Sequence, residues 1–168
     1  MRLWLLWAPW RMSYVERSAR SSETECIFCD AVRSSDEKHY VVYRSKHSIA
    51  MLNLYPYNTA HVMVAPKRHV PSTELLSDEE LLDLFNTVNL VMRAIREEYN
   101  PHGFNVGMNI GRAAGAGIEN HVHVHIVPRW VGDANYMPII ANTKVLPENL
   151  DRTWTRIRKA IERILSSS

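Results

Sequence analysis

Three things are scarce in this sequence, namely long hydrophobic runs, cysteine and net charge, and each absence excludes a class of protein. No apolar run approaches the roughly 18 residues of a membrane-spanning helix, so we expect no contact with a membrane. Two cysteines cannot form the disulfide framework of a small secreted domain. A formal charge of +2 does not suggest the basic face of a dedicated nucleic-acid binder, and we expect no nucleic acid as a partner.

The remaining composition is that of one globular domain. Hydrophobic residues make up 46% and charged residues 23%, and 168 residues are enough to bury a core without disulfide or metal staples. Residues 1–25 are expected to form an N-terminal arm and linker. Their apolar start lacks the features of a cleaved signal peptide, and residues 18–25 are polar and rich in serine. We therefore expect a cytoplasmic protein in which residues 26–168 form a single domain.

Hydrophobic periodicity predicts an α+β fold. A helix is expected to begin after Ser77, a good N-cap, and to end near Asn100. A second amphipathic helix is expected over residues 147–165. Short runs of β-branched and aromatic residues predict an antiparallel sheet of about five strands, packed against these helices. The expected strands are residues 39–43, 47–52, 60–65, 104–110 and 121–127.

Three histidines alternate with apolar residues near the end of the sheet. Because side chains on a strand alternate between its faces, His121, His123 and His125 share one face, and Val122, Val124 and Ile126 share the other. The apolar face is expected to meet the core. The histidine face is then expected to line a cleft, because a buried row of imidazoles would need many polar partners.

Such a row has three interpretations. The histidines could be structural, or two of them could share a metal ion with a nearby carboxylate such as Glu119. A central imidazole flanked by two others could instead attack an electrophilic phosphorus. The loop over residues 109–117 favours this third interpretation, because its glycines let backbone N–H groups approach an anion and Arg112 adds a charge. Alone, such a loop is typical of an ordinary turn.

The segment from His121 to Arg129 resembles the signature of the histidine triad superfamily of nucleotide hydrolases and transferases. The resemblance extends over residues 26–140 and includes Asn53, the segment 60–66 and Asn109. Within the superfamily the sequence looks like the Fhit-type branch rather than the Hint branch. Residues 7–11 and 128–136 make it most similar to the prokaryotic diadenosine tetraphosphate phosphorylases.

This resemblance implies a histidine-triad fold, usually a homodimer with a continuous sheet, and a division of labour among the histidines. His123 would be the nucleophile that forms a nucleotidyl-histidine intermediate, His125 would contact the phosphate and assist the leaving group, and His121 would complete the catalytic row. The substrate would be an adenine nucleotide or a dinucleoside polyphosphate such as diadenosine tetraphosphate. The acceptor would be water or inorganic phosphate. Nucleotide-binding positions would be Asn53, Leu54, His61, Asn109, Gly115, Gly117 and Ile118.

The resemblance departs from the family at one place and leaves other functions open. Family members often carry Gln, Ser or Thr shortly before the first histidine, where this chain has Gly117 and Ile118. Backbone amides of residues 115–118 are the expected replacement. Alternative functions are a Hint-type phosphoramidase that releases AMP from amines and a nucleotide-binding module without catalysis.

Cys26 and Cys29 form a CxxC pair, which in a reducing compartment favours metal binding or redox chemistry. No thioredoxin-like βαβ pattern surrounds the pair, so a redox role is disfavoured. Some triad proteins and the related galactose-1-phosphate uridylyltransferases imply a zinc site made of Cys26, Cys29, His69 and His121. A closed Cys₂His₂ set suits a structural zinc, which would hold His121 and thereby the direction of His123. The alternative is two free thiols packed beneath the N-terminal arm.

Overall fold

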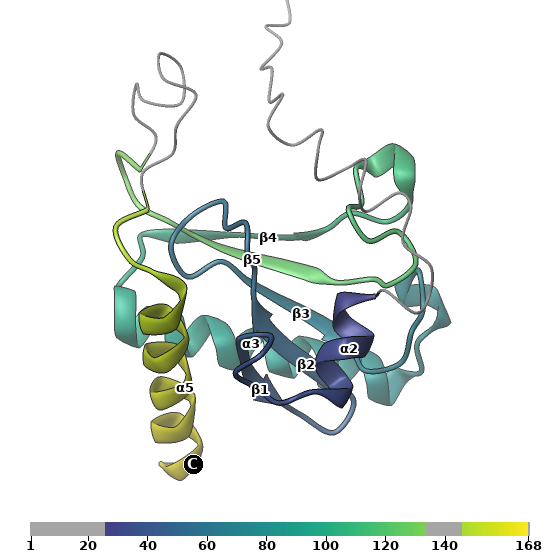
Figure 1. The fold of residues 1–168 in the computed structure, drawn as a ribbon, viewed down its shortest axis with the longest axis horizontal. Coiled ribbons are helices and arrows are strands. Elements are labelled where there is room, and N and C mark those ends of the chain that lie inside the picture. Colours follow the sequence, from purple (N-terminus) through teal and green to yellow (C-terminus); the bar gives the residue numbers. More distant parts are fainter. Residues whose placement is uncertain (1–25, 134–145, 168) are drawn as a thin grey trace, which may run out of the picture.

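The computed structural model describes residues 26–133 and 146–167, which contain one five-stranded antiparallel sheet (Figure 1). The strand order is β1-β2-β3-β5-β4, so the last strand in sequence lies between β3 and the edge strand β4. The predicted α+β class and sheet are confirmed. The expected arm over residues 1–25 lies outside the described residues. The strands are β1 (Val41–Arg44), β2 (Ser48–Leu52), β3 (Val62–Pro66), β4 (Gly103–Met108) and β5 (Val124–Arg129).

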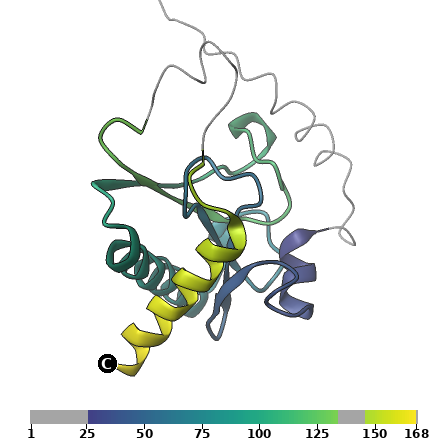
Figure 2. The same cartoon turned by 60° about the vertical axis from the view of Figure 1, so that its left-hand side comes forward.

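Two long helices cover one face of the sheet, as Figures 1 and 2 show. Helix α3 (Asp78–Tyr99) begins with a capping box between Ser77 and Glu80, and it ends at Asn100, which adopts a left-handed conformation. Helix α5 (Leu150–Ser166) begins at Asn149, whose side chain accepts a hydrogen bond from a backbone N–H of the first turn. Both helices were predicted from sequence.

A short helix that the sequence did not predict lies on the opposite face. Helix α2 (Ile27–Arg33) packs Phe28 and Ala31 against the sheet. Two short 3₁₀ turns complete the elements, η3 (Thr73–Leu75) and η4 (Arg112–Ala114). Among the described helices, none is long and apolar enough to span a bilayer.

The core has two layers, one on each face of the sheet. Alternate strand residues such as Val64 and Ile126 join α3 and α5 in the larger cluster, which also contains Leu84 and Ile157. The intervening residues, Met63 among them, join α2 in the smaller cluster. The prediction that Val122, Val124 and Ile126 face the core is confirmed, since all three are buried in the larger cluster.

Strand β5 begins at Val124, and this corrects the predicted strand over residues 121–127. Val64 of β3 pairs with Val124, so Pro66 is the residue that would pair with Val122. Proline has no N–H to donate, and the β3–β5 ladder ends before that pair. The N–H of Val122 donates instead to the carbonyl of Val70, at 2.8 Å. His121 and His123 therefore lie on a segment that precedes the strand and is not paired in the sheet.

Candidate functional site

The three predicted catalytic histidines lie on the α2 side of the sheet, but they do not all line an open cleft. The exposed fraction is 0% for His121 and 4% for His123, whereas His125 is half-buried. The Phe28 ring of α2 covers the first two, with its centroid 5.1 Å from that of His121 and 4.9 Å from that of His123. The expectation that this row lines a cleft did not include helix α2, which buries His121 and His123 and leaves His125 the more exposed of the three.

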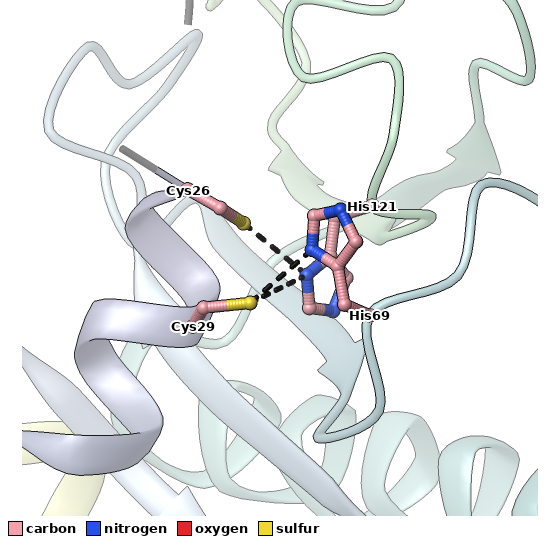
Figure 3. A group of neighbouring side chains, drawn as sticks. All are labelled: Cys26, Cys29, His69 and His121. Carbon is pink, nitrogen blue, oxygen red and sulfur yellow. Dashed lines mark hydrogen bonds between the residues drawn. The ribbon is translucent and has the colours of Figure 1, made fainter. Parts of the chain in front are cut away.

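The four predicted zinc ligands come together at the start of α2 (Figure 3). Cys26 is the N-cap of α2 and Cys29 lies in its first turn, while His69 follows β3 and His121 precedes β5. Their potential ligand atoms all lie within 4.8 Å of one another. Glu119, the alternative carboxylate ligand, is exposed and is not part of this cluster.

The geometry of this group fits a tetrahedral zinc ion. Cys26 Sγ lies 3.3 Å from His121 Nδ1, and Cys29 Sγ lies 3.2 Å from His69 Nδ1 and 3.7 Å from His121 Nδ1. Tetrahedral bonds of about 2.3 Å to sulfur and about 2.0 Å to nitrogen place such atoms about 3.5 Å apart. His121 Nε2–H donates to the carbonyl of Pro66 at 2.7 Å, which leaves the Nδ1 lone pair directed at the two sulfurs.

Arg44 of β1 holds the cysteine-bearing helix against the sheet. Its guanidinium donates to the carbonyls of Val32, Ala31 and Ser34 at 2.7–3.1 Å. These carbonyls lie at the C-terminal end of α2, where backbone carbonyls lack helical partners, so one side chain binds three of them. The position of Cys26 and Cys29 therefore depends on an arginine that the sequence pattern did not single out.

Hydrogen bonds to the backbone fix the ring form of His123. His123 Nδ1–H donates to the carbonyl of His121 at 2.9 Å, so Nε2 of the neutral ring is unprotonated and carries a lone pair. Burial lowers the pKa of His123, and burial lowers the pKa of His121 to about 4. Both rings are therefore neutral near pH 7, which is the form that a nucleophile and a metal ligand require.

A fourth histidine, His61, determines which ring nitrogen of His125 carries the proton. The N–H of Tyr57 donates to His61 Nδ1 at 3.1 Å, so the proton of neutral His61 is on Nε2. That Nε2–H donates to His125 Nδ1 at 3.0 Å, which places the proton of His125 on its own Nε2. The rings of His123 and His125 meet edge to face, with centroids 4.8 Å apart. The pair thus presents one acceptor nitrogen and one donor nitrogen.

The predicted nucleotide-binding positions lie on two loops beside these rings. Asn53 follows β2 and accepts the N–H of Tyr55 at 2.9 Å, and the neighbouring Leu54 is exposed. The Asn109 side chain reaches the carbonyl of Gly115 at 3.5 Å. Gly115 has φ +83°, a backbone conformation that favours glycine. Gly117 and Ile118 are half-buried, and Ile118 packs against the α2 cluster. Nucleotide contact by these residues stays a prediction.

Sequence reasoning missed several residues that shape the site. Phe28 lies in a helix too short to show a period, and Tyr57 acts through its backbone N–H, for which side-chain identity gives no signal. The tyrosine ring itself stacks on His125, with centroids 5.8 Å apart. The one available signal in the sequence was the position of Phe28 between the two cysteines, which places an aromatic ring close to the predicted metal ligands.

The HIT domain family matches residues 34–131, more than half of the chain. The chain belongs to the HIT family. This HIT protein is 45% identical over 154 residues to a protein from Mycobacterium tuberculosis named AP-4-A phosphorylase, a match that covers 88% of this chain and 79% of that protein. It is 42% identical over 93 residues to the asymmetrical bis(5'-nucleosyl)-tetraphosphatase of Schizosaccharomyces pombe, covering 55% of this chain and 50% of the relative.

Solved structures of HIT proteins share the fold. A zinc-bound histidine triad family protein from Mycobacterium smegmatis superposes with a TM-score of 0.70 at 22% identity, covering 88% of this chain and all of that one. A histidine triad nucleotide-binding protein from Sulfolobus tokodaii gives a TM-score of 0.68 at 29% identity, covering 83% of this chain and 93% of that one. The predicted histidine-triad fold is confirmed.

Proposed function

We propose that this HIT protein is an enzyme that cleaves dinucleoside polyphosphates such as diadenosine tetraphosphate through a nucleotidyl-histidine intermediate on His123. The observation that carries the proposal is the pairing of an unprotonated Nε2 on His123 with an Nε2–H on His125. The relatives named for action on such nucleotides support this substrate class.

His123 performs the first displacement in this proposal. Its Nε2 forms a bond to the α-phosphorus while the bond from that phosphorus to the bridging oxygen breaks. His125 donates its Nε2 proton to the departing polyphosphate oxygen. In the second step an acceptor oxygen attacks the same phosphorus, the phosphorus–nitrogen bond breaks, and the proton that the acceptor gives up returns to His125.

The two loops would hold the substrate around these rings. Backbone N–H groups of Gly115, Gly117 and Ile118, together with the Asn109 side chain, would bind the phosphates. Asn53 would bind the ribose hydroxyls, with the exposed Leu54 beside the base. His61 belongs to the site through His125 rather than through the nucleotide.

The acceptor decides whether the reaction is phosphorolysis or hydrolysis. Purified protein is incubated with diadenosine tetraphosphate, with and without inorganic phosphate. ADP and ATP that form only with phosphate identify a phosphorylase, which is the outcome that the more extensive match favours. AMP and ATP identify a hydrolase. Absence of cleavage in both samples contradicts the proposal.

A phosphoramidase is the second candidate, since the same two nitrogens could transfer AMP from an amine. AMP-lysine is therefore tested beside diadenosine tetraphosphate at equal concentration. Preferential release of AMP from the amine conjugate would assign the Hint-type activity instead. A non-catalytic nucleotide-binding module would bind AMP without turning over either compound.

The cofactor in this proposal is one structural zinc ion held by Cys26, Cys29, His69 and His121. Four protein ligands leave no open coordination position, so the ion supplies rigidity rather than a bound reactant. Cysteines that bind a metal rather than form a disulfide suit a reducing compartment such as the cytoplasm. Metal analysis of purified protein should give about one zinc per chain, and less than about half an equivalent would contradict the site.

We expect a homodimer with a continuous sheet. Strand β4 is an edge strand that pairs only with β5 within the described residues, and its Val106 is 44% exposed. Pairing of two β4 strands would join the sheets and cover this side chain. We expect no membrane or nucleic-acid partner. In α5, for instance, Arg156, Arg158 and Arg163 are already paired with acidic groups. Light scattering coupled to size exclusion checks the dimer.

A further inference from the structure

Asp133 and Asn58 join two segments that are far apart in the sequence, the loop between β2 and β3 and the turn after β5. The amide of Asn58 donates to Asp133 Oδ2 at 2.8 Å and to the carbonyl of Pro128 at 3.0 Å. Asn58 is 7% exposed, so its amide lies away from bulk water. A buried amide that makes both of these bonds fixes the loop that carries it.

The Asp133 carboxylate is itself held in place by three further donations. Arg129 Nε donates to Oδ2 at 2.7 Å, Arg129 Nη2 donates to Oδ1 at 2.9 Å, and the N–H of Trp130 donates to Oδ2 at 3.2 Å. A two-point contact with a guanidinium sets the plane of a carboxylate as well as its position. Asp133, Asn58 and Arg129 are together called the clasp below.

The loop that the clasp holds contains a strained residue. Ala60 has φ +62°, a conformation that residues with a Cβ rarely adopt. Asn58 brackets the strained turn, since its side-chain oxygen accepts the N–H of Thr59 at 3.3 Å and its carbonyl accepts the N–H of His61 at 3.2 Å. Such a turn persists only where the surroundings impose it, and the clasp makes the contacts that do so.

The clasped loop also determines which nitrogen of His61 carries the proton. Tyr57 precedes Asn58, and its N–H donates to His61 Nδ1. If this N–H moved away, Nδ1 could take the proton, and Nε2 could no longer donate to His125 Nδ1. His125 would then lose the bond that directs its own Nε2–H.

We propose that Asp133 and Asn58 are positioning residues that set the ring form of His61 and, through it, the direction of the His125 proton donor. The spectroscopic part of this proposal stands on the hydrogen bonds alone. The effect on turnover rests on the proposed function.

The test compares Asp133→Ala with the native protein, with histidine rings labelled with ¹⁵N and two-bond ¹⁵N–¹H correlation spectra recorded. The native spectrum should show His61 in the single form protonated on Nε2, assigned with His61→Gln. Asp133→Ala should show a mixture of both ring forms. With diadenosine tetraphosphate, kcat should fall about 10- to 100-fold, since small misplacements of reacting groups cost this much, while KM changes less than about 3-fold.

Two further variants separate positioning from a loss of folding. Asp133→Asn keeps a side-chain oxygen for the Asn58 amide and should restore much of the native spectrum and kcat. Glu98→Ala is the matched control, because Glu98, like Asp133, accepts from guanidinium groups, but from Arg156 and Arg163 between α3 and α5. It should lower the melting temperature without changing the His61 spectrum or kcat.

The proposal is overturned if Asp133→Ala retains the single His61 form and native kcat, or if Glu98→Ala changes both as strongly. If native protein does not cleave diadenosine tetraphosphate, the proposed function fails, and the ring spectra still decide whether the clasp controls His61.

Discussion

The two faces of the sheet are built from the same strands and do different work. Val62 and Val64 face α3 and α5, where the buried contacts are apolar and ion pairs lie at the rim. Met63 lies on the other face and pairs with His125, and there α2 and three buried histidines bring polar groups into the interior. The period of two in a strand therefore separates the residues that stabilise the fold from those that carry chemistry.

Comparison of the two faces shows how imidazole rings can be buried without destabilising the fold. On the α3 and α5 face almost every buried group is a hydrocarbon, and burial alone is favourable. On the α2 face each buried triad ring donates to a backbone carbonyl, His121 to Pro66 and His123 to His121. Such bonds offset the cost of removing a polar ring from water, and they also select the nitrogen that is left free.

The largest expected effect is the loss of turnover in His123→Asn, on the α2 face of the sheet. Asparagine keeps a polar side chain but has no ring nitrogen that can form the intermediate, so turnover should fall about 10³-fold or more. Nucleotide binding, measured by calorimetry with AMP, should persist, as should the melting temperature within a few degrees. Survival of activity in this variant would show that another group is the nucleophile.

Leu84→Ala should lower the stability of the fold through the face that α3 and α5 cover. Leu84 of α3 is fully buried in the larger cluster, and removing its branched side chain leaves a cavity. Urea unfolding should show a loss of about 3 kcal/mol, whereas zinc content and kcat at low temperature should stay near native values. If Leu84→Ala lost zinc as well as stability, the packing on one face would affect the metal site on the other.

Phe28→Leu should sharpen the comparison, because it changes the cover of His121 and His123 without removing a polar group. We expect a stability loss of about 1 kcal/mol and a fall in kcat of about 10-fold, caused by looser rings. Ile157→Val in α5 is the matched control, with a similar stability loss and unchanged kcat. Equal kcat values in the two variants would contradict a role for the Phe28 ring in holding His121 and His123 in place.

The smallest effect concerns pH and the rim of the α3 and α5 face. Burial raises the pKa of Glu98, but hydrogen bonds from Arg163 and Arg156 outweigh it, and the pKa lies below its ordinary value of 4.5. The unfolded chain therefore binds the proton first as pH falls. This contribution, about 1 kcal/mol or less, should be complete above about pH 5 and lost as pH falls below 4.5. Glu98→Gln should flatten the unfolding free energy over that window, and an unchanged slope would contradict it.

The parts of the fold that sequence predicted are those with a local signal. Helix α3 was predicted from Ser77 and its apolar spacing, and β2 and β3 from their short apolar runs. Helix α2 has seven residues, too few for a period to appear. The start of β5 was wrong because its cause, Pro66, lies on a different strand.

The candidate site likewise contains residues with a local sequence signal and residues without one. Alternation placed the three histidines on one side, but the convergence of Cys26, Cys29, His69 and His121 came from family resemblance rather than from spacing. Asp133 and Asn58 gave no pattern, because a contact across 75 positions leaves no local trace in the sequence.

Pro66 shows how a single missing donor can create chemistry elsewhere. In a continued ladder, the carbonyl of Pro66 would accept the backbone N–H of Val122. Because the ladder ends before that pair, the carbonyl of Pro66 accepts a side-chain proton from His121 instead. An irregular end of the sheet therefore supplies the hydrogen bond that leaves His121 Nδ1 facing the two sulfur atoms.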